Sequence, residues 1–173
     1  RLNHILDIDI PNRRITVEPG VTNLEVTKAV SSQGCYYAPD PSSQVICSIG
    51  GNVAENSGGA HCLKYGFTVH HVLGLEVVLP NGVMIQVGGI ALDPPGLDLL
   101  GVLVGSEGTL AVVTKVTLRL LGKPAAVKTL LAAFDSTEEA GNAVSGIIGA
   151  GIIPAAVEMM DRTTIEAAEA AVH

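Results

Sequence analysis

The sequence has no tryptophan, and it is poor in other aromatic residues and in charge. Aromatic residues make up 3% of the 173 residues and charged residues 16%, whereas 47% are hydrophobic. This composition excludes a disordered chain and is typical of a globular protein with a substantial core. Ten Lys and Arg stand against 17 Asp and Glu, and the net charge of −7 argues against nucleic acid or an anionic membrane as a partner.

Cysteine is also scarce, and its spacing excludes two kinds of site. The three cysteines, Cys35, Cys47 and Cys62, form no Cys-x-x-Cys pair. The sequence therefore indicates neither a disulfide framework nor an iron–sulfur cluster, and it favours a reducing compartment. The neighbouring histidines fit no standard zinc spacing, and we predict no metal site.

Several targeting and nucleotide-binding motifs are absent as well. The sequence has no signal peptide, and the apolar run over residues 97–121 is interrupted by Glu107, Lys115 and Arg119, so it is not a membrane span. Neither a Walker Gly-Lys-Ser/Thr motif nor a Gly-x-Gly-x-x-Gly motif between a strand and a helix is present. A P-loop or Rossmann site is therefore disfavoured.

Glycine, by contrast, is concentrated in two segments, residues 39–66 and 105–110. The first contains Gly-Gly-Asn-Val-Ala-Glu-Asn-Ser-Gly-Gly and, between residues 45 and 59, no Lys or Arg. Glycine leaves the backbone N–H accessible, and Ser48 could cap a short helix over residues 50–55 and aim such groups at an anion. We predict that main-chain amides hold a phosphate here. Tight turns between buried segments are the alternative reading.

Periodicity predicts an α+β pattern for the first 122 residues. Thr22 and Glu25 form a capping box for a helix that Gly34 closes. Asn81-Gly82 joins two strands as a hairpin. The apolar segment 99–104 is compatible with a strand or a helix. The predicted strands cover residues 15–18, 75–79, 83–87 and 109–120.

The pattern changes after Lys123-Pro124, which we interpret as a domain boundary between residues 1–122 and 123–173. Ser136 and Glu139 form a second capping box before a helical apolar stripe. We predict strands over residues 127–134 and 152–159 and a last helix over 163–172. Both ends of the sequence lack the signals of free termini, so we interpret the chain as part of a longer protein.

Four motifs in this order resemble one family. Pro-Asp-Pro-Ser-Ser, Gly-Gly-Asn-Val-Ala-Glu-Asn-Ser-Gly-Gly, Lys-Tyr-Gly and Gly-Ser-Glu-Gly-Thr-Leu are similar to the vanillyl-alcohol-oxidase-type (PCMH-type) FAD-binding family. Within it, the sequence most resembles the group of bacterial glycolate oxidase D subunits and D-lactate dehydrogenases, over essentially its whole length. The resemblance implies the second subdomain and part of the first subdomain of the FAD-binding domain, followed by the start of a ferredoxin-like cap domain.

The resemblance implies that FAD lies between the two α+β subdomains, and it gives each motif a share of the site. The matching positions are Asp40, Pro41 and Ser43 in the first motif, Gly50, Gly51, Asn52, Ala54, Asn56, Gly58 and Gly59 in the second, Tyr65 and Gly66 in the third, and Glu107, Gly108, Val112 and Val113 around the fourth. For each position, a turn or packing role is the alternative.

The implied activity is oxidation of a 2-hydroxy acid, glycolate to glyoxylate or D-lactate to pyruvate, with further subunits that include an iron–sulfur one. The implied location is the cytoplasm, with partner subunits as a link to the inner membrane. The family's histidine motifs would follow His173, so we nominate no catalytic residue. His61, His70 and His71 are the available bases, and we expect a structural role or an exposed position for each.

Two departures from the family pattern bear on the cofactor. The glycine-rich loop that normally precedes the region of Arg1 is missing, and Ala111 stands where the family has glycine. A left-handed backbone at Ala111 would cost on the order of 1 kcal/mol. A catalytically inactive fragment that folds without flavin, or another phosphate- or nucleotide-binding module, are the competing readings. The sequence does not distinguish the 2-hydroxy acid, the electron acceptor or the oligomeric state.

Overall fold

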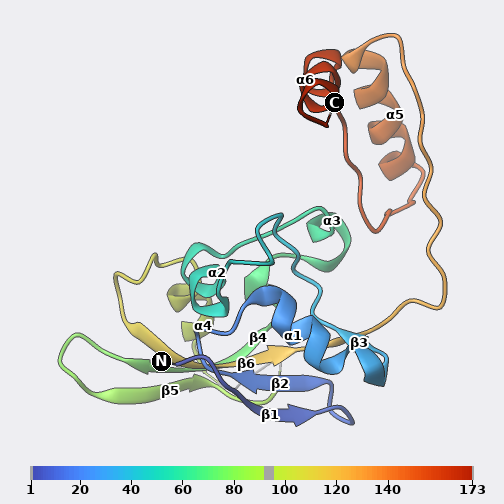
Figure 1. Ribbon diagram of the computed structural model, residues 1–173. Helices are drawn as coiled ribbons and strands as arrows, with labels where there is room; N and C mark the ends of the chain where they lie inside the picture. The colour runs from blue at the N-terminus through green and yellow to red at the C-terminus, as the bar shows by residue number, and fades with distance from the viewer. Residues whose placement is uncertain (1, 92–95, 173) are drawn as a thin grey trace.

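A five-stranded antiparallel sheet with helices on one face forms the body of the molecule (Figure 1). The computed structural model describes residues 2–91 and 96–172. The strands follow the order β1-β2-β6-β4-β5. Their bounds are Ile5–Asp9 for β1, Arg14–Val17 for β2, Val72–Val78 for β4, Met84–Gly88 for β5 and Val112–Arg119 for β6. The α+β class predicted from the sequence is confirmed.

The β4–β5 hairpin forms at the predicted Asn-Gly turn. Gly82 has a φ of 81°, the left-handed conformation that favours glycine at such a turn. Strand β1 was not predicted, although it pairs with β2 along its length. Its register shifts between Ile5 and Asp7, and its apolar side chains are exposed. Residues 6–10 nevertheless alternate between apolar and acidic residues, so the pattern of a strand was present in the sequence and was overlooked.

The core lies between the helical layer and the inner face of the sheet. Central strands contribute fully buried side chains such as Ile15, Val116 and Leu118. The outer face carries polar pairs instead, among them Lys115 Nζ with Glu76 Oε2 at 2.9 Å. This alternation follows from the two-residue period of a strand and fixes which face the helices cover.

Helix α1 (Asn23–Val30) begins at the predicted capping box. The Thr22 side chain accepts from the N–H of Glu25, and the Glu25 carboxylate accepts from the N–H of Thr22 at 2.8 Å. The helix continues into a 3-10 turn, η1 (Ser31–Gln33), which ends at Gly34 with a φ of 73°. Both ends therefore agree with the sequence signals.

Helix α2 (Ile49–Glu55) is short and tied to the body at both ends. Ser48 caps it, as predicted, by accepting from the N–H of Gly51 at 3.1 Å. The amides of Ile49 and Gly50 donate to the carbonyls of Val21 and Pro19, each at 2.8 Å. At the other end, the carbonyl of Val53 accepts from Gly105 N and that of Ala54 from Glu107 N.

Smaller elements complete the body. Strand β3 (Cys35–Tyr36) pairs with β7 (Leu121–Gly122) in a two-stranded sheet. Helix α3 (Cys62–Tyr65) and the 3-10 turn η2 (Thr68–His70) precede β4. Helix α4 (Leu99–Leu103) settles the segment that periodicity left open, because the Asp98 side chain caps it at Gly101 N. None of the helices in the described ranges is both long and apolar enough to cross a membrane.

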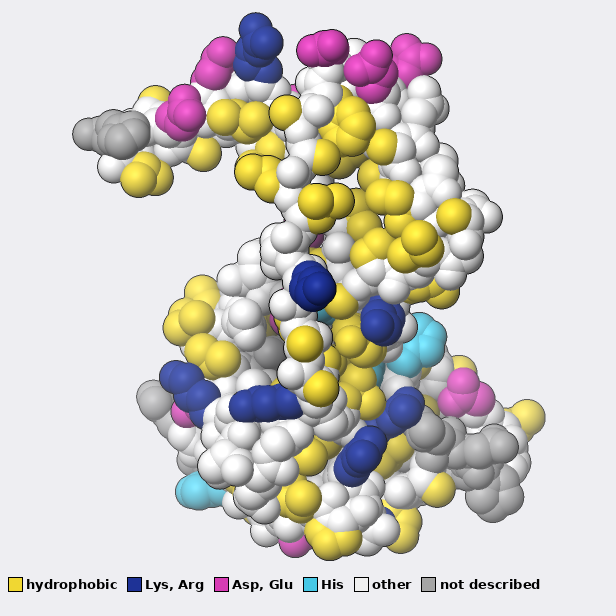
Figure 2. All heavy atoms as spheres, turned by 90° about the vertical axis from the view of Figure 1, so that its right-hand side faces the viewer, with side chains coloured by type: hydrophobic (Ala, Val, Ile, Leu, Met, Phe, Trp, Pro, Cys, Tyr) yellow, Lys and Arg dark blue, Asp and Glu magenta, His cyan; other side chains and the backbone are white. Residues whose placement is uncertain are grey.

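The last third of the chain leaves the sheet after β7 and forms a separate lobe of two helices, α5 (Thr137–Gly149) and α6 (Arg162–Val172) (Figure 1). Ser136 caps α5 as predicted, with its Oγ accepting from the N–H of Glu139. Hydrophobic side chains gather on the exposed surface of this lobe and its connection (Figure 2).

The strands predicted over residues 127–134 and 152–159 are wrong. Both segments are irregular, and Leu130 and Leu131 are 89% and 92% exposed. A strand is stabilised by a hydrogen-bonded neighbour, and neither segment has one within the described ranges. Apolar periodicity alone therefore overestimated the regular structure of this part.

The two neighbouring glycines of α2 should respond differently to alanine. A Cβ at Gly50 would lie 2.6 Å from Pro19 Cβ, whereas one at Gly51 would meet only the Ser48 Oγ, at 3.2 Å. We expect Gly50→Ala to lower the free energy of unfolding by about 1–3 kcal/mol through overpacking. Gly51→Ala should leave it unchanged or raise it by up to about 1 kcal/mol through helix propensity. Urea unfolding of both variants tests this, and equal effects would contradict it.

His71 should make stability depend on pH. It is buried, its Nε2–H donates to the Tyr65 carbonyl at 2.8 Å, and burial lowers its pKa below the usual value. Below about pH 6.5, His71 is therefore protonated in the unfolded chain but still neutral in the folded chain. The free energy of unfolding falls as the pH falls toward the folded-state pKa. His71→Gln, which keeps the donor, should flatten this slope in thermal melts between pH 7.5 and 5.5. An unchanged slope would refute the assignment.

Candidate functional site

An open groove of about 690 Å³ lies where α2 meets the glycine-rich turn before β6. Pro19, Gly20 and Gly50 line one side, and Ser106 and Gly108 line the other. The volume falls within the range of roughly 300–1,000 Å³ that is usual for small-molecule and cofactor sites. The groove therefore joins the two glycine-rich segments that the sequence singled out.

The groove is lined mainly by small and apolar residues and by no Asp, Glu, Lys or Arg of the described ranges. Its polar side chains are Asn3, Ser48 and Ser106. An anion placed here would find backbone groups and neutral side chains rather than a cation. This is the lining that the sequence predicted for a phosphate site without cationic side chains.

The prediction that the first amides of α2 point at an anion is wrong. Gly50 N donates to the Pro19 carbonyl, and Gly51 N donates to the Ser48 hydroxyl. Both amides are already satisfied, because Gly50 N anchors the short helix to the segment before α1 and Gly51 N is bonded to the N-cap residue. The glycines allow close packing here, since a side chain on Gly50 would overlap Pro19.

The turn from Gly105 to Thr109 leaves one amide unaccounted for. Gly105 N and Glu107 N donate to α2 carbonyls. Ser106 N donates to the Leu103 carbonyl, and Thr109 N donates to the Ser106 carbonyl. Gly108 N donates to no acceptor in the part of the chain that the structure describes. Gly108 lines the groove with a φ of 71°, so it is the amide best placed for a bound anion.

The groove gathers some of the predicted cofactor residues. They are Gly50, Gly51 and Ala54 from α2, Gly108 from the turn, and Val112 and Val113 from the start of β6. Glu107 is exposed and has a φ of 53°, a conformation that non-glycine residues seldom adopt. Contact of these residues with FAD stays a prediction.

A second group of predicted residues lies apart from the groove lining, where the loop of residues 57–66 packs on the turn that contains Asp40. His61 Nδ1–H donates to Asp40 Oδ2 at 2.6 Å. A side chain on Gly59 would overlap the Asp40 carbonyl, and one on Gly58 would overlap Phe67. The second Gly-Gly pair is thus a close-packing feature, and it does not line the groove.

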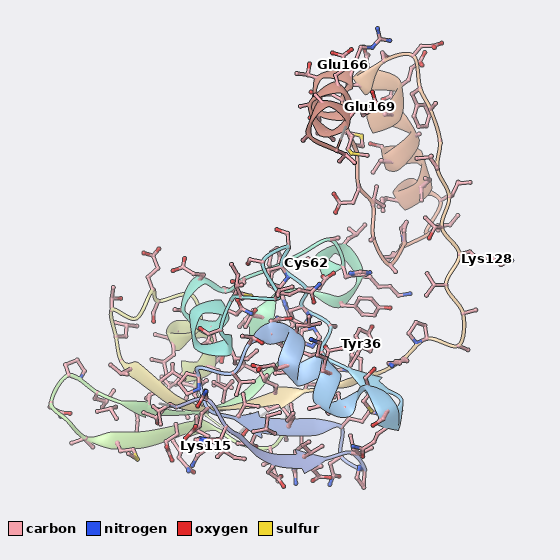
Figure 3. All side chains as sticks on the ribbon, in the orientation of Figure 1. Tyr36, Cys62, Lys115, Lys128, Glu166 and Glu169 are labelled. Carbon is pink, nitrogen blue, oxygen red and sulfur yellow. The ribbon has the colours of Figure 1, made fainter. Side chains whose placement is uncertain are left out.

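Tyr65 and Gly66 close this loop. The Tyr65 ring stands edge-on to that of Tyr36, with 6.3 Å between the ring centroids. Gly66 has a φ of 83° and leaves no room for a side chain beside His70. Figure 3 labels Tyr36 on β3 and Cys62 on α3, the two elements that border this corner. This segment is called the 57–66 loop.

Pro41 and Ser43 begin a compact turn that follows Asp40. The Pro41 carbonyl accepts from Gln44 N at 2.8 Å, and the Ser43 carbonyl accepts from Ile46 N and Cys47 N at 2.9 Å each. The carbonyls of Gln44 and Cys47 also accept from Leu24 N and Asn23 N, so the turn is bonded to the start of α1 as well as within itself. The Ser43 side chain is left exposed.

Asn52 and Asn56, both predicted cofactor residues, have different surroundings. Asn56 ends α2 with a φ of 49°, and its Oδ1 accepts from Val69 N at 2.9 Å, so it has a clear structural role. Asn52 is 2% exposed, and its Nδ2 has no partner among the described residues. Asp40 Oδ1 is likewise buried without a partner. Neither residue lines the groove, and the described residues supply no partner for either atom.

The concern about Ala111 is resolved for the backbone. Ala111 does not have a positive φ, so its side chain imposes no left-handed strain. The residue is 8% exposed and its methyl group lines the groove. An alanine at this position is therefore compatible with the fold that forms the groove.

Sequence reasoning missed part of the groove wall. Leu2, Asn3 and Pro19-Gly20 line it, yet their sequence reads only as a chain end and a turn. Ser106 lies inside the quoted Gly-Ser-Glu-Gly motif and could have been nominated on that basis. No group of three or more metal-binding side chains occurs within residues 2–91 and 96–172.

Two family models match the chain. The model of the FAD binding domain matches residues 1–88, and the model of the C-terminal domain of FAD linked oxidases matches residues 123–173. The first match covers just over half of the chain and includes the Pro-Asp-Pro turn, both Gly-Gly pairs and the Lys-Tyr-Gly segment.

Curated relatives agree with these matches. The chain is 56% identical over 173 residues to "Glycolate oxidase subunit GlcD" of Escherichia coli (strain K12), covering 100% of this chain and 35% of that protein. It is 51% identical over 165 residues to the subunit of the same name from Bacillus subtilis, covering 95% and 35%. It is 38% identical over 165 residues to "D-lactate dehydrogenase" of Archaeoglobus fulgidus, covering 95% and 37%. The chain thus spans about a third of the length of these relatives.

The fold also matches solved structures. Alkyldihydroxyacetonephosphate synthase superposes on 90% of this chain and 28% of that chain, with a TM-score of 0.74 and 24% identity. This match supports the arrangement of sheet and helices. The family follows from the first family model, which matches just over half of the chain: the chain belongs to the FAD binding domain family, whose cofactor is FAD.

Proposed function

We propose that this chain forms part of the FAD site of an oxidoreductase that converts a 2-hydroxy acid to the 2-oxo acid, glycolate to glyoxylate or D-lactate to pyruvate. The names of the curated relatives supply the two substrates. The observation that carries the proposal is the uncharged groove between α2 and the turn at residues 105–108. The groove lies at segments that carry the family's motifs, as expected for a chain that contributes part of a cofactor site.

The residues of the chain would bind and orient the cofactor. Gly108 N–H would donate to an anionic part of the cofactor in the groove, and Ser48 and Ser106 contribute neutral polar side chains to the same lining. Asn52 Nδ2 and Asp40 Oδ1 are buried and have no hydrogen-bond partner within residues 2–91 and 96–172. Bound FAD would supply the acceptor for the hydride equivalent from the substrate's α-carbon. No proton-transfer step is assigned to a side chain of this chain.

We further propose a division of the chain at residue 122. The sheet, its helices and the groove would make up the FAD-binding part, and residues 123–173 would begin a cap domain that contributes to the substrate pocket. The extended connection between β7 and α5 and the exposed apolar surface of the α5–α6 lobe support this division. The substrate pocket would then be shaped by residues of both parts.

The proposal extends to partners and location. Two relatives are named as subunits of glycolate oxidase, so we expect further subunits, one of which would carry an iron–sulfur cluster. We expect a cytoplasmic protein that such partners could hold at the inner membrane. Copurification with the products of neighbouring genes, followed by iron and sulfide analysis, would test this part independently of the flavin.

The central test is the visible spectrum of the protein purified from the whole reading frame. We expect flavin absorbance bands near those of free FAD and their bleaching by glycolate or D-lactate under anaerobic conditions, since the substrate would reduce the flavin. Dithionite reduction is the positive control, and L-lactate tests the stereochemistry. A yellow protein that neither 2-hydroxy acid bleaches would remove the proposed activity, whereas a colourless one that FAD cannot reconstitute would remove the cofactor role.

A bulky side chain at Gly51 should block the cofactor without damaging the fold. Gly51 is exposed on the groove and has open space around it apart from Ser48. We expect Gly51→Leu to weaken FAD binding at least tenfold, about 1.4 kcal/mol, in a titration of the apoprotein. Gly146→Leu, at a helical glycine of α5 with open space, is the matched control and should bind FAD normally. Equal affinities for both variants would contradict the placement of FAD in this groove.

A further inference from the structure

One hydrogen bond between side chains joins two segments that both carry predicted cofactor residues. Asp40 lies in the Pro-Asp-Pro turn, and His61 lies in the 57–66 loop, 21 residues later. The 2.6 Å distance from Nδ1 to Oδ2 is that of a short charge-assisted hydrogen bond. A carboxylate accepts only, so His61 carries its proton on Nδ1 and its Nε2 is left for another contact.

The 57–66 loop is held near Asp40 at further points. Its backbone approaches the Asp40 carbonyl at Gly59, where no side chain would fit. Gly59 N donates to Cys62 Sγ at 3.0 Å, and Thr68 Oγ1 donates to the Ser57 carbonyl at 2.7 Å. These contacts define the path of the loop, and the Asp40–His61 pair is its one side-chain bond to the Pro-Asp-Pro turn within the described ranges.

The pair is poorly placed to stabilise the fold itself. The side chains of His61 and Asp40 are 43% and 23% exposed, and ion pairs that water reaches in this way contribute little to folding stability. Asp40 Oδ1, however, is buried and has no partner among the described residues. One oxygen of the carboxylate thus holds the loop, while the other faces the backbone at Gly59, where an added Cβ would lie 2.6 Å from it.

Polar and aromatic groups surround the pair. Tyr65 lies 6.3 Å from the His61 ring, centroid to centroid, and Lys64 Nζ lies 5.5 Å from the Tyr65 ring centre. Tyr36 stands edge-on to Tyr65. The corner is therefore amphipathic, and it is apart from the groove between α2 and the turn at residues 105–108.

We propose that Asp40 and His61 are positioning residues that hold the 57–66 loop against the bound cofactor. This inference rests on the proposed FAD site. A loop fixed before binding loses less conformational freedom when the ligand arrives, so the pair would increase affinity through preorganisation. Asp40 would act through Oδ2, which holds the loop. His61 would act through Asp40 and the loop.

The test is FAD affinity in protein purified from the whole reading frame, stripped of flavin and titrated with FAD. We expect Asp40→Ala and His61→Ala each to weaken binding at least tenfold. The double variant should lose no more than the larger single loss, because the two side chains act as one unit. Asp9→Ala is the matched control. It breaks the 2.6 Å Asp9–Arg14 ion pair on the sheet and should bind FAD within twofold of the unaltered protein.

A conservative pair of variants separates positioning from general damage. His61→Asn places an amide donor where Nδ1 was and should retain affinity within about threefold, whereas His61→Gln places it too far along the side chain and should behave like His61→Ala. This comparison also decides the matter if the alanine variants fail to fold. Melting temperatures of the flavin-free variants should stay close to that of the unaltered protein.

The outcomes distinguish this inference from the function on which it rests. If the unaltered protein does not bind FAD, both the FAD site and the pair's role are refuted. If it binds FAD and the alanine variants bind within twofold of it, the pair has no positioning role and the FAD site stands. Equal affinities for His61→Asn and His61→Gln would likewise overturn the inference.

Discussion

The structure depends on how the two ends of helix α2 are bonded. A seven-residue helix cannot stabilise itself in water, and its terminal N–H and C=O groups need partners. The carbonyls of Pro19 and Val21 accept from its first amides, and the amides of Gly105 and Glu107 donate to its last carbonyls. These bonds join the segment before α1, the helix and the turn before β6. The same three parts line the groove, so the constraint that places the helix also creates the candidate site.

Local signals predicted the fold well where a short motif decides the structure. The Thr22–Glu25 capping box, the Asn81-Gly82 turn and the Ser48 cap all formed as expected, because each depends on side chains within a few residues. Strand β1 was missed although residues 6–10 alternate between apolar and acidic residues, which is the pattern of a strand. The strands expected after residue 122 failed for a different reason, since their apolar pattern is present but a strand also needs a neighbour that local sequence does not reveal.

The candidate site was predicted in part. The motifs identified the two glycine-rich segments, and the structure brings Gly50, Gly51 and Gly108 to one groove. Their roles were harder to predict, because glycine serves both close packing and amide exposure, and only the hydrogen-bond partners distinguish the two. Gly50 and Gly59 turn out to be packing positions, whereas the N–H of Gly108 has no acceptor among the residues that the structure describes. The wall at Pro19 could not be predicted, since it depends on a contact between segments about 30 residues apart.

The distribution of tyrosine gives this molecule a built-in optical reporter. The chain has three tyrosines and no tryptophan. Tyr36 and Tyr65 are in edge-on contact, and Tyr37 packs against His71, whose ring is bonded to the Tyr65 carbonyl. Ultraviolet emission from the chain therefore comes almost entirely from this one corner. Because no indole masks it, phenol emission and its transfer of excitation energy to a nearby isoalloxazine would report on the 57–66 loop without any added label.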